Sequence, residues 1–77
     1  MNIKVVDIDL AKNIFQLCIL LKDNSIQSNR KINRTKFLHP MRKLPSGTLV
    51  AIGACGTSHY WARTLISLGL NVKFDVV

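Results

Sequence analysis

Residues 3–10, with the sequence IKVVDIDL, begin the pattern that decides the fold. The run is rich in β-branched residues and alternates apolar with polar side chains near its end, so it predicts a β-strand. Ala11, Lys12 and Asn13 predict a turn, after which residues 14–22 form a second strand whose two faces are both mostly apolar. Such a strand is typical of a sheet with cover on both sides, so we expect layers above and below it.

Turn residues and helical spacing divide the rest of the chain into further elements. Asp23 and Asn24 tolerate the left-handed backbone of a hairpin turn, and Pro45 to Gly47 mark a clear stop. The expected elements are strands at residues 26–32, 48–54 and 71–77, and helices at 34–43 and from Thr57 or Ser58 to Gly69. The order β-β-β-α-β-α-β predicts an α/β domain over residues 1–77 with a mixed five-stranded sheet whose third strand lies near an edge.

Three residues indicate where the two helices begin, bend and pack. Asn33 is the expected N-cap of the first helix, while Pro40 should kink that helix or divide it into separate turns. Trp61 shares a helical stripe with Leu65 and Leu68, so we expect it to be a core aromatic residue.

The charge balance points to a polyanionic partner. Lys and Arg total 11 against 4 acids, none of them Glu, which gives a net charge of +7. No acid lies between Asp23 and Asp75, so nucleic acid is the expected partner, although a solvated basic surface is the alternative. The best candidates for phosphate contacts are Arg30, Lys31, Arg34, Lys36, Arg42 and Lys43.

Cysteine usage and hydropathy indicate a cytoplasmic protein with no membrane partner. Cys18 and Cys55 occur without a signal-peptide pattern, so we expect reduced thiols. A zinc site with His39 and His59 has no recognised spacing. The longest apolar run is too short to span a bilayer.

Asp7 and Asp9 form the first candidate for chemistry. They are two residues apart on a strand, so both side chains should point to the same face of the sheet. Paired carboxylates at the end of a central strand suit Mg²⁺ and phosphodiester chemistry, while a turn cap and a solvated side chain are the bland alternative.

Two blocks resemble the DEDD-type transposases of the insertion sequence 110 family. Residues 5–17, VVDIDLAKNIFQL, resemble the family's opening strand V-G-I-D-L-A-K-x-x-F. Residues 54–63, ACGTSHYWAR, resemble its E-A-C-G-S-x-H-Y-W-A-R, at a fitting distance. The resemblance implies a ribonuclease H-like domain in which four acids hold Mg²⁺, with DNA as substrate, a guide RNA, and a serine-bearing C-terminal domain.

Carried over by position, Asp9 matches the first acid of that set, and Asp7 stands where the family usually has Gly. Gly53 stands where the family has the second acid, a Glu, and glycine offers no ligand atom. The strand at residues 48–54 is expected beside the strand at residues 3–10, so position 53 should face Asp9 across the sheet. We therefore expect Asp9 to be a vestigial catalytic residue and a weak metal ligand, with Mg²⁺ not bound stably.

The resulting expectation is a truncated and degenerate transposase N-terminal domain that lacks the later helices and is inactive alone. The alternative is a small non-catalytic basic module that binds nucleic acid. A weaker third hypothesis is a phosphate or nucleotide binder that uses the turn from Gly53 to Ser58, because glycines before a helix expose backbone N–H groups. His59 and Arg63, four residues apart, are expected either to meet a phosphate or to lie on a solvated helix face.

Overall fold

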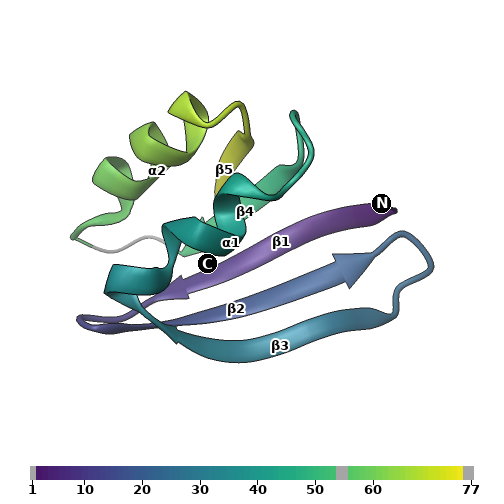
Figure 1. Ribbon diagram of the computed structural model, residues 1–77, viewed down its shortest axis with the longest axis horizontal. Helices are drawn as coiled ribbons and strands as arrows, with labels where there is room; N and C mark the ends of the chain where they lie inside the picture. The colour runs from purple at the N-terminus through teal and green to yellow at the C-terminus, as the bar shows by residue number, and fades with distance from the viewer. Residues whose placement is uncertain (1, 54–55, 76–77) are drawn as a thin grey trace.

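The computed structural model describes residues 2–53 and 56–75, which form a twisted sheet with its helices on one side (Figure 1). Each strand of the sheet begins and ends close to a turn residue. The elements are β1 (Ile3–Leu10), β2 (Ile14–Leu21), β3 (Ile26–Asn33), the 3-10 turn η1 (Arg34–Lys36), α1 (Leu38–Arg42), β4 (Leu49–Gly53), α2 (Ser58–Ser67) and β5 (Asn71–Asp75). Residue 54 of the expected fourth strand and residues 76–77 of the fifth lie outside the described residues.

The strands lie in the order β3-β2-β1-β4-β5, which places β1 at the centre. β1 pairs with β2, and β2 with β3, in antiparallel fashion, whereas β4 is parallel to both β1 and β5. This confirms a mixed five-stranded sheet with the third strand at an edge. The ribonuclease H-like assignment goes further than this topology and stays a prediction.

The hairpin turn between β2 and β3 forms as its residue types predict. Asn24 has a φ of 70°, in the left-handed region that Asn tolerates. The Asp23 carboxylate accepts hydrogen bonds from the backbone N–H of Ser25 at 2.9 Å and from the Ser25 hydroxyl. This local network fixes the register in which β3 returns along β2.

The predicted first helix is two short helical segments, η1 and α1, separated at Phe37. Pro40 lies inside α1 and cannot donate a backbone hydrogen bond, so the division into separate turns is confirmed. Asn33 occupies the N-cap position of η1, as predicted, but its side chain makes no capping hydrogen bond. Asn33 is also the last residue of β3, and its extended backbone leads directly into the 3-10 turn.

The core lies between the sheet and the helices and is built around three aromatic rings. Phe15, Phe37 and Trp61 contact one another edge to face, with ring centroids 4.9 to 5.3 Å apart. Phe15 and Phe37 are fully buried and Trp61 nearly so, which confirms Trp61 as a core residue. Edge-to-face contacts are the favoured aromatic geometry, and here they join β2, α2 and the junction between η1 and α1.

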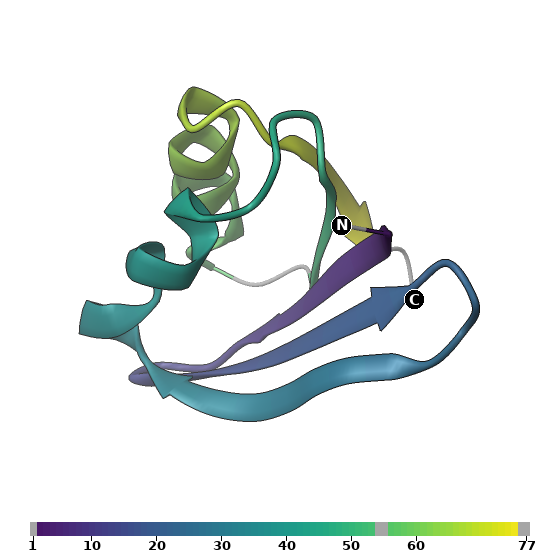
Figure 2. The same cartoon turned by 45° about the vertical axis from the view of Figure 1, so that its right-hand side comes forward.

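The opposite face of the sheet carries no helix in the described part of the chain (Figure 2). Leu17 and Phe15 on β2 are buried beneath the helices, but Cys18 and Leu20, which point the other way, are only half buried. The expectation that β2 is covered on both sides is therefore wrong for the described residues.

Candidate functional site

The open face of the sheet carries an acidic cluster formed by Asp7, Asp9 and Asp75. Asp7 and Asp9 lie on the central strand β1, as predicted, and Asp75 ends β5. Gly53 of β4 lies between the two strands, because Gly53 is paired with Asp75 and Ile52 with Ile8 of β1. The three carboxylates line a cavity of about 260 Å³ whose other lining residues are Gln16, Cys18 and Gly53.

The position of Gly53 faces Asp9, as the sequence predicts. A Cβ atom placed on Gly53 would lie 3.9 Å from Asp9 Oδ1 and 3.9 Å from the Ile8 carbonyl oxygen, which are ordinary contact distances. A side chain at position 53 would therefore fit beside the Asp9 carboxylate without steric conflict. What glycine removes from this site is a donor atom, while the space for one remains.

Asp7 on β1 and Asp75 on β5 interact across β4, the strand that lies between them. Their carboxyl groups share a hydrogen bond, and the β4 residues on this face, Ala51 and Gly53, are too small to separate them. Partial burial raises the pKa of Asp7 above its usual value, and the negative charges of Asp75 and Asp9, with the Asp75 hydrogen bond, raise it further. The sequence alone did not place Asp75 in this cluster. Only the pairing of β5 with β4 brings Asp75 close to Asp7, and the sequence does not show that pairing.

The donor set does not fit a stable Mg²⁺ site. Within residues 2–53 and 56–75, no three His, Cys, Asp or Glu side chains are arranged to hold a metal ion. Partial burial and the neighbouring carboxylates Asp75 and Asp9 raise the pKa of Asp7, and Gly53 supplies no side-chain oxygen. Of the four residues considered for zinc, Cys18 is a free half-buried thiol and Cys55 lies outside the described residues.

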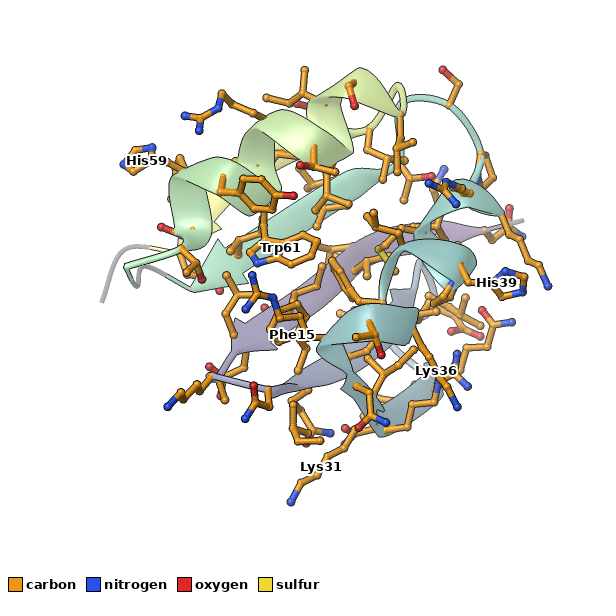
Figure 3. The ribbon with its side chains drawn as sticks, turned by 60° about the vertical axis from the view of Figure 1, so that its left-hand side comes forward. Phe15, Lys31, Lys36, His39, His59 and Trp61 are labelled. Atoms are coloured by element: carbon orange, nitrogen blue, oxygen red, sulfur yellow. The ribbon has the colours of Figure 1, made fainter. Side chains whose placement is uncertain are left out.

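The six predicted nucleic-acid contacts are all exposed, but they do not form one flat patch. Lys31 pairs with Gln16 on the open face of the sheet, whereas Arg30 pairs with the buried Leu17 and so points to the helix side. Arg30 and Lys43 line a cavity of about 340 Å³ together with His39 of α1. Lys31, Lys36 and His39 all project outward from the β3–α1 region (Figure 3). The cations therefore lie on both faces of the region formed by β3, η1 and α1.

Arg34 differs from the other five cations because its exposed side chain lies over an aromatic ring of the core. Its guanidinium carbon lies 5.9 Å from the centroid of the Trp61 ring, within the range of a cation–π interaction. His59 and Arg63 are both exposed, and the ring of His59 lies 5.1 Å from that of Phe74 on β5. His59 thus contacts a neighbouring strand, and the prediction that the two residues meet a phosphate stays a prediction.

No helix in the described residues is both long and apolar enough to cross a membrane. No protein-family model matches the chain. No solved structure matches it either.

Three relatives are similar to this chain over most of its length. A Pseudomonas aeruginosa protein named "Probable family 20 transposase" is 38% identical over 73 residues, which is 95% of this chain and 21% of the relative. The transposase for insertion sequence element IS1111A of Coxiella burnetii is 30% identical over 72 residues, 94% of this chain and 20% of its own length. A third relative named as a transposase, from Sinorhizobium fredii, is 35% identical over 68 residues, or 88% of this chain and 17% of that protein.

The chain spans about a fifth of the length of these relatives, or somewhat less. Over that portion the similarity includes most of the five-stranded sheet and its helices. The chain is therefore homologous, over nearly all of its residues, to part of proteins that are named as transposases.

Proposed function

We propose that this chain is the N-terminal, ribonuclease H-like part of a DEDD-type transposase of the insertion sequence 110 kind, which contacts DNA and does not cleave it unaided. Support for the transposase assignment comes from three relatives so named. Support for the DEDD assignment comes from Asp9 on the central strand and from the strand-to-helix block that ends in α2. A structured guide RNA is a further partner that the same resemblance suggests.

The observation that carries the proposal of inactivity is that the Asp9 carboxylate faces Gly53, a residue that has no side chain. A Cβ at position 53 would lie 3.9 Å from Asp9 Oδ1, so a Glu there would complete a carboxylate pair. Mg²⁺ prefers several hard oxygen ligands, and one carboxylate holds it weakly. If Mg²⁺ bound here, Asp9 would hold it and the ion would stabilise charge on a phosphodiester.

Contact with nucleic acid rests on the exposed cations around β3 and α1. A test is to measure duplex DNA binding by fluorescence anisotropy at several salt concentrations, with the Lys31→Gln/Lys36→Gln double variant. We expect binding that weakens steeply with salt, and a slope that is smaller by about 0.9 for each phosphate that the variant no longer neutralises. The matched control is Lys4→Gln/Lys22→Gln, which removes two exposed charges near the β2–β3 turn at the other end of the hairpin. Binding without salt dependence would contradict the proposed interaction.

Inactivity has a direct test in metal binding and cleavage. We expect no Mg²⁺- or Mn²⁺-dependent cleavage by the chain, and weak Mn²⁺ binding by calorimetry. Gly53→Glu should tighten Mn²⁺ binding roughly tenfold, because it adds a carboxylate beside Asp9. Gly53→Gln is the matched control, since it fills the same space without the charge. Cleavage by the unchanged chain that disappears in Asp9→Ala would overturn the proposal.

A further inference from the structure

Two cavities meet where the turn between β1 and β2 approaches the first turn of α2. Both are lined by Arg34 and Trp61, and together they are called the Arg34 groove. The first cavity, of about 280 Å³, is lined by Leu10, Ala11, Lys12, Phe15, Arg34, Gly56, Thr57 and Trp61. The second, of about 540 Å³, is lined by Asn13, Asn33, Arg34, Thr35, Tyr60 and Trp61. Among the described residues no acid lines either cavity, so the groove is set up for a negatively charged ligand.

Arg34 is held in place at the middle of the groove. Its backbone N–H donates a hydrogen bond of 2.9 Å to the Asn13 carbonyl oxygen, which ties η1 to the β1–β2 turn. Its guanidinium lies over the ring of Trp61, which is itself fixed by its packing against Phe15 in the core (Figure 3). A guanidinium resting on an aromatic face still presents N–H donors at its edge, and these suit phosphate oxygens.

Tyr60 gives the groove an aromatic wall that is open to solvent. Its side chain is 53% exposed, in contrast to the buried Trp61 beside it. The two rings contact each other edge to face at 5.1 Å, with planes at 84°. The orientation of Tyr60 is therefore fixed by a core residue while its ring remains available. Exposed aromatic rings beside cations are the surfaces on which single-stranded nucleic acids stack their bases.

We infer that the Arg34 groove binds an unpaired nucleotide of a nucleic-acid strand, with its base stacked on Tyr60 and its phosphates held by Arg34 and Lys12. Asn13 and Asn33 line the same cavity, and a side-chain amide can match the polar edge of a base. A cavity of about 540 Å³ is in the size range of small-molecule sites. A base in a duplex is already stacked and cannot use Tyr60, so the groove selects unpaired strands. This inference deepens the proposed function and rests on nucleic acid being the partner.

The experiment compares labelled single-stranded DNA, single-stranded RNA and duplex DNA of equal length, titrated with the full chain and followed by fluorescence anisotropy. We expect a single strand to bind more tightly than the duplex. Tyr60→Leu should weaken single-strand binding roughly tenfold and leave duplex binding within about twofold. Tyr60→Phe, which keeps the ring, should bind as the unchanged chain does. Phe74→Leu is the matched control, because Phe74 is also an exposed aromatic residue but lines neither cavity.

A second readout reports the stacking itself. With 2-aminopurine in the oligonucleotide, its fluorescence should be quenched by the unchanged chain and by Tyr60→Phe, and not by Tyr60→Leu. The DNA and RNA arms show which strand supplies the nucleotide. Duplex binding as tight as single-strand binding, or unchanged affinity and quenching in Tyr60→Leu, overturns the inference and leaves the proposed function standing. Absence of binding to all three nucleic acids overturns both.

Discussion

The pKa of Asp7 depends on the arrangement of three strands. Its carboxyl group is on β1, but the largest influences on its pKa after burial come from Asp75 on β5. The interaction exists because Gly53 and Ala51 leave the space above β4 empty. A large side chain at either position would separate the two carboxyl groups, so the chemistry of Asp7 depends on the smallness of its neighbours.

The raised pKa of Asp7 predicts a pH-dependent stability. The folded state binds the Asp7 proton more tightly than the unfolded state, so this group favours folding at low pH, and that contribution disappears as the pH rises through its folded pKa. Asp7→Asn should therefore stabilise the chain at about pH 7, by no more than about 1 kcal/mol because solvent screens this exposed group, and should change little at about pH 3. Urea unfolding at the two pH values measures the difference.

Asp23 provides the opposite case for the same experiment. Hydrogen bonds from the Ser25 side chain and backbone lower its pKa, so its contribution to stability is present at neutral pH and is lost in acid. Asp23→Asn should lower stability at neutral pH.

An Asp7→Asn effect that is equal at both pH values would mean that the raised pKa is not its cause.

At the scale of elements, β2 shows that an apolar strand can be buried on one side only. Phe15 and Leu17 lie beneath the helices, while Cys18 and Leu20 face the open side of the sheet. Alternating side chains of similar hydropathy therefore contribute unequally to stability. The difference is set by where α1 and α2 pack, which is information that the strand itself does not contain.

A pair of leucine substitutions on β2 measures this inequality. Leu17→Ala should reduce the free energy of unfolding by about 3 kcal/mol, because Leu17 is fully buried and leaves a cavity. Leu20→Ala, the same change on the open face, should cost less than about 1 kcal/mol. Circular dichroism during urea unfolding checks both variants. Equal losses would show that another chain, such as a second copy, covers the open face in solution.

For the whole molecule, the sequence predicted the sheet far better than the site. Strand positions followed from alternation and from turn residues such as Asn24, whose backbone conformation is local. The facing of Asp9 by Gly53 was also predictable, since both residues lie near the ends of strands that the element order places side by side. The role of Asp75 and the packing of Arg34 over Trp61 were not predictable. Each depends on a contact between side chains whose elements are distant in the sequence.

Acidic and basic side chains gather in different parts of the molecule. Asp7, Asp9 and Asp75 lie on the open face near one end of β1, while most of the predicted phosphate contacts surround β3, η1 and α1. A polyanion approaching the chain is therefore attracted to the hairpin and helix side and repelled by the acidic cavity. Asp9→Asn should accordingly strengthen nucleic-acid binding slightly, as measured by fluorescence anisotropy, which is the opposite of what a metal-dependent interaction would give.

The arrangement of β1 at the centre, with hairpin partners on one side and crossover partners on the other, implies a sequence of events in folding. β1, β2 and β3 are joined by short turns, so their pairing closes only small loops and is entropically cheap. β4 and β5 must wait for longer connections, and β5 follows all the other strands in chain order. We therefore expect the two hairpins to pair before β5 docks, so that the repulsion between Asp75 and the carboxylates of β1 opposes the docking of β5 and not the pairing of the hairpins.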